Sequence, residues 1–117
     1  MKLISPKLHG IIDYLVVAFL LASPLGFGFT GLLAIFTYIL GVIHLALTLL
    51  TDFSCGVIKL IPLSFHGMIE LIVGVVLIIL AFTLFKDEAT GKIFYAIFGA
   101  AVVLVWLLTD YRKSSII

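Results

Sequence analysis

The sequence predicts an all-α membrane protein, a four-transmembrane-helix bundle made of two tandem parallel two-helix repeats. Three observations lead to this prediction. The 117 residues are 64% hydrophobic and only 11% charged, with a mean hydropathy of +1.41, whereas about a quarter of the residues in soluble domains are charged. Four apolar stretches are each long enough to cross a hydrocarbon layer about 30 Å thick. Two short motifs occur twice, in the same order.

The same composition excludes several other classes of protein. A net charge of +1 does not suit a nucleic-acid binder, and a chain with one cysteine has no internal disulfide scaffold. The high apolar content excludes a disordered chain. The lipid bilayer is therefore the expected partner, and association into a homo-oligomer or a larger membrane complex remains open.

The four helices are predicted as one transmembrane domain over residues 1–117, with short connections. Continuous apolar runs favour helices over the alternating strands of a membrane barrel. Ser5 before Pro6 is a typical helix start, and Ser23-Pro24 is predicted to end the first helix. Thr90 is predicted to cap the fourth. The predicted spans are about Pro6 to Ala22, Gly31 to Thr51, Pro62 to Phe85 and Lys92 to Thr109.

Lysine and arginine positions predict the orientation in the membrane. Four spans place both termini and the central loop on one side. That side carries five basic residues and the other side two, which favours cytoplasmic termini. The five are Lys2, Lys7, Lys59, Arg112 and Lys113, and the two are Lys86 and Lys92.

An internal repeat is the strongest pattern in the chain. The segment His9-Gly10-Ile11-Ile12-Asp13 recurs 57 residues later as His66-Gly67-Met68-Ile69-Glu70. The segment Leu49-Leu50-Thr51-Asp52-Phe53 recurs 58 residues later as Leu107-Leu108-Thr109-Asp110-Tyr111. We therefore expect repeat one over about 1–57 and repeat two over about 58–117. Each repeat contains two helices, so both enter the membrane from the same side and are parallel repeats.

The first repeat also resembles a known family. The stretch His9-Gly10-Ile11-Ile12-Asp13-Tyr14, followed by Ser23-Pro24-Leu25, is similar to the SPW-repeat family of small bacterial integral membrane proteins. Leu25 stands where the family has tryptophan. The resemblance implies a bacterial inner-membrane location and two-helix repeats, and it implies no chemistry.

The ionisable residues inside the apolar helices are the candidate functional site, because charged groups in a bilayer are costly and usually functional. The repeat topology places six of them in one layer near the cytoplasmic side, and His44 about 12 Å deeper at ~1.5 Å per residue. The candidate site comprises His9, Asp13, His44, Asp52, His66, Glu70 and Asp110.

Helix geometry predicts how this layer is paired. His9 and Asp13 are four residues apart, as are His66 and Glu70, so each pair shares one helix face. Asp52 and Asp110 end their helices, where an anion meets the negative dipole end and needs a positive partner. We therefore expect His9 to pair with Asp52 and His66 with Asp110. Asp13 and Glu70 then face the opposite repeat.

Three functions follow from this layer. The first is a non-enzymatic membrane module or accessory subunit without a cofactor, because no loop is long enough to hold a substrate. The second is a metal-ion or proton-handling site, since His9, Asp13, His66 and Glu70 suit Zn²⁺ or Mn²⁺ by ligand type. The third is a b-type haem held by His9 and His66. The sequence contains no pattern typical of an enzyme.

Overall fold

The computed structural model describes residues 2–111 and has four α-helices. They are α1 (Pro6–Phe27), α2 (Gly31–Leu49), α3 (Leu63–Ala81) and α4 (Ala89–Leu108). In the loop between α2 and α3, the short strands β1 (Thr51–Asp52) and β2 (Ile61–Pro62) pair in parallel. All four helices are long and apolar enough to cross a membrane, which indicates a multi-pass membrane protein. The predicted all-α four-helix bundle is confirmed.

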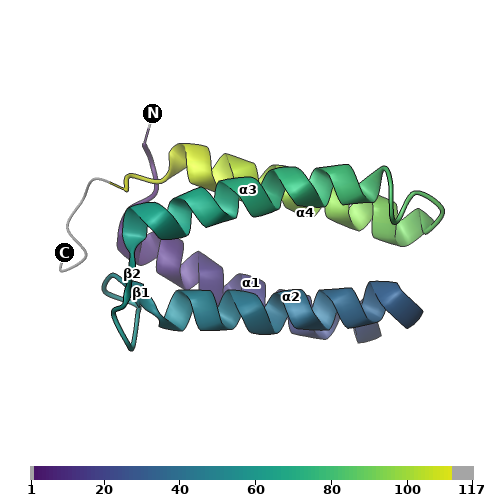
Figure 1. Cartoon of the computed structure of the whole chain (residues 1–117), viewed down its shortest axis with the longest axis horizontal. Helices are drawn as coiled ribbons and strands as arrows, with labels where there is room; N and C mark the ends of the chain where they lie inside the picture. Colours follow the sequence, from purple (N-terminus) through teal and green to yellow (C-terminus); the bar gives the residue numbers. More distant parts are fainter. Residues whose placement is uncertain (1, 112–117) are drawn as a thin grey trace.

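The bundle consists of two helical hairpins, α1–α2 and α3–α4, that lie against each other (Figure 1). The start of α1, the end of α4 and the β1–β2 pair lie at one end, and the two hairpin turns lie at the other. Lys2, Lys7 and Lys59 belong to the first end. Arg112 and Lys113, which also entered the prediction of orientation, lie outside the described residues.

The first helix is longer than predicted. Ser5 caps α1 as expected, since its side chain accepts a hydrogen bond from the backbone N–H of Leu8. Pro24, however, lies inside the helix, which continues to Phe27 and ends on Gly28 at φ 70°. A proline near a helix end removes only one donor, and a glycine in the left-handed region provides a stronger stop.

The α3–α4 turn also differs from the prediction. Helix α3 ends at Ala81 and not at Phe85, because the chain folds back there and buries Phe85 against Phe36 and Tyr95. Helix α4 then begins at Ala89, so Thr90 lies inside the helix and does not cap it. The predicted second helix is shortened likewise, since Thr51 belongs to β1.

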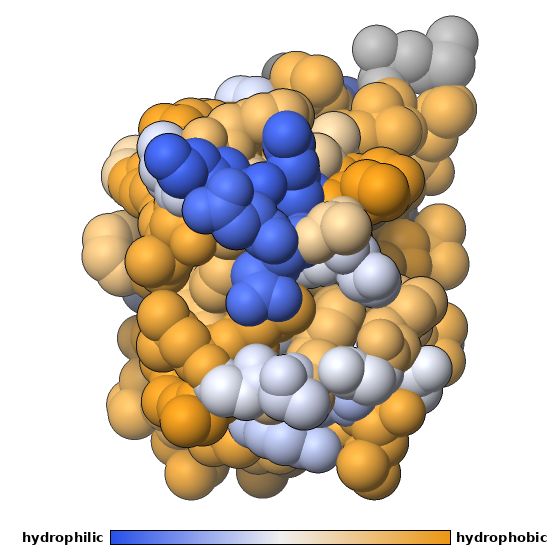
Figure 2. All heavy atoms as spheres, turned by 90° about the vertical axis from the view of Figure 1, so that its right-hand side faces the viewer, coloured by the Kyte–Doolittle hydropathy of each residue, from blue (hydrophilic) through white to orange (hydrophobic). Residues whose placement is uncertain are grey.

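The surface of the bundle is apolar apart from its ends. Figure 2 looks onto the hairpin turns, where hydrophilic side chains gather over the α3–α4 hairpin and hydrophobic ones surround them. The turn there contains Lys86, Asp87 and Glu88, all exposed as predicted. Many large apolar side chains on the flanks, including Leu15 and Ile97, are more than half exposed, which suits contact with lipid.

A candidate metal centre

Four ionisable side chains meet inside the bundle near the end with the β1–β2 pair. Helix α1 supplies His9 and Asp13, and α3 supplies His66 and Glu70, each pair from positions four apart on one helix face. Their relative exposures are 0%, 2%, 0% and 6% in that order, so the whole group is buried. One potential ligand atom from each residue lies within 4.8 Å of the others.

The contacts within this group cross between the hairpins. Nε2 of His9 lies 2.7 Å from Glu70 Oε2, and Nε2 of His66 lies 3.1 Å from Asp13 Oδ2. Within each helix, Nε2 of His9 is 3.3 Å from Asp13 Oδ1 and Nε2 of His66 is 2.9 Å from Glu70 Oε2. The expectation that Asp13 and Glu70 face the opposite repeat is therefore confirmed.

Two threonines determine which ring nitrogen of each histidine bears hydrogen. The Thr51 hydroxyl donates to the Leu47 carbonyl oxygen, and the Thr109 hydroxyl donates to that of Val105, each over 2.6 Å. A hydroxyl has one hydrogen to donate, so each threonine oxygen accepts from the histidine beside it. The Nδ1–H of His66 therefore donates to Thr51 over 2.6 Å, and that of His9 donates to Thr109 over 2.8 Å.

This arrangement leaves both Nε2 atoms directed at the carboxylates. If those nitrogens carried only lone pairs, they would face carboxylate lone pairs at 2.7–3.3 Å, which is repulsive. Protons, on the imidazoles or on the carboxyl groups, or a metal ion must therefore lie among the four groups. Asp13 Oδ2, which is buried without a hydrogen-bond partner among the described residues, is directed into the same space.

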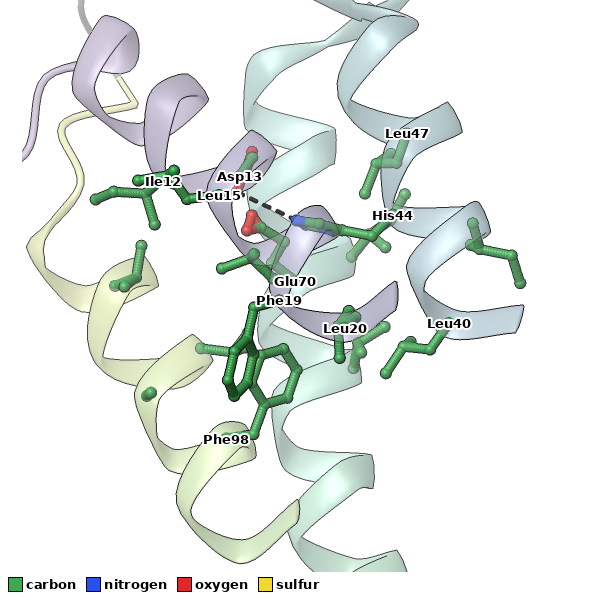
Figure 3. A pocket seen from close by; sticks show the side chains of 17 residues that line it. Ile12, Asp13, Leu15, Phe19, Leu20, Leu40, His44, Leu47, Glu70 and Phe98 are labelled. Atoms are coloured by element: carbon green, nitrogen blue, oxygen red, sulfur yellow. Dashed lines mark ion pairs between the residues drawn. The ribbon is translucent and has the colours of Figure 1, made fainter. Parts of the chain in front are cut away.

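His44 joins this group from α2. Its Nε2 lies 3.4 Å from Asp13 Oδ1, and Figure 3 shows the ring directed across the pocket at that carboxylate. The predicted depth of about 12 Å is counted from Asp52. Asp13 itself lies about two turns into α1, which brings its carboxylate within reach of the His44 side chain. His44 therefore contacts α1 from α2, although its Nε2 makes no hydrogen bond among the described residues.

Asp52 and Asp110 do not belong to the centre. The predicted pairs His9–Asp52 and His66–Asp110 are wrong, because both ring nitrogens of each histidine are directed at the threonines and at Asp13 and Glu70. In an extended segment successive side chains point to opposite sides. Thr51 is buried and Asp52, its neighbour in β1, is exposed. The threonines were missed although both lie in the repeated Leu-Leu-Thr-Asp segment.

The surroundings of the two histidines are equivalent but crossed between the halves. His9 packs against Tyr111, with ring centroids 5.6 Å apart, and His66 packs against Phe53 at 6.0 Å. Each of these aromatic rings also packs against the glycine of its own half: a Cβ added to Gly67 would lie 2.7 Å from the Tyr111 ring, and one added to Gly10 would lie 2.7 Å from the Phe53 ring.

Backbone hydrogen bonds also run from each half of the chain to the other. The N–H of Ile4 donates to the Leu108 carbonyl over 2.9 Å, and the N–H of Ile61 donates to the Leu50 carbonyl over 2.8 Å. Ile4 and Ile61 precede the first helix of each half. Leu108 ends α4, and Leu50 directly follows the end of α2. Each half thus completes the histidine site of the other.

The centre does not fit a haem. A macrocycle between two axial histidines needs open space between their Nε2 atoms. Glu70 Oε2 occupies that space, at 2.7 Å from one Nε2 and 2.9 Å from the other. The haem alternative is therefore dropped.

Beyond the centre, the bundle is filled by an apolar core. Leu20, Leu33, Leu77 and Phe85 pack together there, and the buried Thr37 and Tyr95 hydroxyls hydrogen-bond to each other over 2.5 Å. In the part of the chain that the structure describes, no ionisable row continues from the centre to the hairpin turns.

No protein-family model, curated protein or solved structure matches this chain. The resemblance to the SPW-repeat family therefore stays a prediction, and the chemistry of the centre is argued from its own residues.

Proposed function

We propose that this protein is a non-enzymatic membrane module whose buried centre binds one divalent transition-metal ion and thereby joins its two hairpins. The observation that carries the proposal is the group of four buried ligand atoms, two imidazole nitrogens and two carboxylate oxygens, within 4.8 Å of one another. His9, Asp13, His66 and Glu70 are the proposed ligands.

The ligand geometry supports a tetrahedral ion. Bonds of about 2.0–2.2 Å to Zn²⁺ place tetrahedral ligand atoms roughly 3.3–3.5 Å apart. The four histidine–carboxylate distances are 2.7–3.3 Å, so these contacts need to lengthen by up to about 0.8 Å. Any pair of ligand atoms near the 4.8 Å limit needs to approach. Among common metals, imidazole with carboxylate suits Zn²⁺ first and Mn²⁺ second.

The charge balance supports the same ion. Two carboxylates carry two negative charges, and the threonines hold both histidines as Nδ1–H tautomers whose Nε2 atoms are free to ligate when neutral. A divalent ion then makes the centre neutral, which a low-dielectric interior favours. Four protein ligands leave no open position for a substrate, which favours a structural site over a catalytic one.

The crossed contacts support the internal repeat and the joining role. Each half supplies one histidine, one carboxylate and the threonine that orients the other half's histidine. We infer a duplicated two-helix unit in a bacterial inner membrane with cytoplasmic termini. Reporter fusions at residue 117 and in the Lys86 turn should then lie on opposite sides of the membrane.

Metal content tests the proposal. Protein purified in lipid nanodiscs, loaded with Zn²⁺ or Mn²⁺ and desalted, should retain one ion per chain by elemental analysis. Glu70→Gln should lose it, because a neutral amide oxygen is a far weaker ligand. Asp52→Asn and Asp110→Asn are matched controls that remove carboxylates outside the centre and should retain the ion.

The competing function is a metal-free network of two imidazolium and two carboxylate groups that only pairs the helices. It is favoured by the short His9–Glu70 distance of 2.7 Å, which is typical of a charge-assisted hydrogen bond. If the loaded wild type retains no more metal than Glu70→Gln, this network is the function and the metal proposal is wrong.

A further inference from the structure

A cavity of about 390 Å³ adjoins the centre and lies between the two hairpins. All four helices line it, and its walls are apolar except at one end, where Asp13, His44 and Glu70 reach it (Figure 3). The volume falls in the range of small-molecule sites. It holds roughly 13 non-hydrogen atoms at about 30 Å³ each.

The cavity opens toward the lipid-facing flank of the bundle. Leu15, Phe19 and Ile43 line it, and they are 66%, 45% and 59% exposed. They lie in the middle turns of helices that are long and apolar enough to span a membrane. A molecule that enters here comes from the hydrocarbon layer and is itself largely apolar.

The polar end of the cavity has one donor and one acceptor without good partners. His44 Nε2 is buried without a hydrogen bond among the described residues, and the Asp13 oxygen that faces it is Oδ1, while Oδ2 lies 3.1 Å from His66 Nε2 in the centre. Because His44 Nε2 faces the Asp13 carboxylate at 3.4 Å, that nitrogen carries the hydrogen. The spacing is too long for a strong direct bond and leaves the N–H and the oxygen available to a third group.

A hydroxyl is the head group that satisfies both. Its oxygen accepts from His44, and its hydrogen is donated to Asp13. A carboxylate head would place a third anion beside Asp13 and Glu70, and an ammonium head has no lone pair to accept from His44. We propose that this cavity binds a single-chain amphiphile with a neutral hydroxyl head and an apolar tail of about ten carbons, taken from the membrane. The proposal does not depend on whether the centre holds a metal ion.

A photoreactive 1-decanol carrying a diazirine tests this assignment on the full chain in nanodiscs. Labelling should saturate, map to cavity-lining residues, and be displaced by 1-decanol but not by decanoate, decylamine or decane. His44→Leu should raise the half-saturating concentration about ten-fold, which is the loss of affinity expected when one buried hydrogen bond is removed. His44→Gln should bind more tightly than His44→Leu, because its amide still donates a hydrogen bond.

Val102→Phe fills the cavity and should abolish saturable labelling, whereas Val76→Phe, on an exposed position of α3 outside the cavity, should leave it unchanged. Circular dichroism and metal content of each variant report whether the fold and the neighbouring centre are intact, so the two proposals fail separately. Non-saturable labelling, labelling unaffected by Val102→Phe, or preferential displacement by decanoate or decylamine would each overturn the proposal.

Discussion

The threonines beside the histidines provide the most direct test of the centre. Thr51→Val and Thr109→Val keep the side-chain shape and remove the oxygen that accepts from the histidine Nδ1–H. Both threonines and both histidines are 0% exposed, so water does not replace the lost partner. A buried donor left without a partner costs about 1–3 kcal/mol. We expect each variant to lose that much stability, and the two losses to be similar because the contacts are equivalent.

Thr48→Val is the matched control. Thr48 is equally buried, but among the described residues its hydroxyl has one hydrogen bond, donated to the His44 carbonyl oxygen within α2. Its loss should cost less than about 1 kcal/mol, because that carbonyl stays in the helix. Reversible unfolding in mixed micelles, followed by circular dichroism, measures all three. If Thr51→Val and Thr109→Val cost no more than Thr48→Val, the assignment of hydrogen to Nδ1 is wrong.

Four further predictions follow from the packing and the centre. The same two threonine variants should weaken metal affinity about 10–100-fold, as measured by chelator competition, since they orient the ligands. Gly67→Ala places a Cβ 2.7 Å from the Tyr111 ring and should cost about 1–3 kcal/mol, whereas Gly26→Ala, with nothing within 4 Å, should be neutral or slightly stabilising. Removal of the metal ion by a chelator should lower the free energy of unfolding by about 2.7 kcal/mol, compared with protein at a free metal concentration of 100 Kd. Equal melting curves with and without the chelator would contradict a joining role. Burial raises the pKa of Tyr111 above its usual value near 10. Tyr111 therefore ionises more readily in the unfolded chain, and the free energy of unfolding should fall as the pH rises above about 10. Tyr111→Phe should reduce that fall when the free energy of unfolding is measured across alkaline pH.

The sequence predicts the fold well because membrane insertion imposes simple rules. Apolar length identified all four spans, and the four-residue spacing of His9 with Asp13 and of His66 with Glu70 placed those pairs on shared faces. The helix ends were harder, because they depend on tertiary packing. Phe85 leaves α3 to fill the core, and nothing in the local sequence around it indicates that.

The partners of the histidines were mispredicted for a related reason. Whether Thr51 or Asp52 points inward depends on where α2 ends and on the phase of the extended segment that follows. A shift of one residue there exchanges the two side chains. The prediction chose the aspartates as histidine partners because of their charge. Burial of a carboxylate at a helix C-terminus is, however, less favourable than burial of a threonine. The threonine hydroxyl also donates to a carbonyl oxygen of the last helical turn.

The crossed contacts explain why the centre needs both halves of the chain. In a single hairpin, His9 would lack both Glu70 and Thr109, and Asp13 would lack His66. Only the longer contacts of Asp13 with His9 and His44, at 3.3 Å and 3.4 Å, would remain, so these groups would be poorly paired in an apolar environment. Such groups are costly enough in a bilayer to disfavour the separate hairpin. Pairing across the interface turns the same groups into a specific connection between α1 and α3. The polar residues therefore select one partner and one register for two otherwise apolar hairpins. With neutral histidines the same buried set of nitrogen and oxygen atoms carries two negative charges, which is what a divalent ion requires.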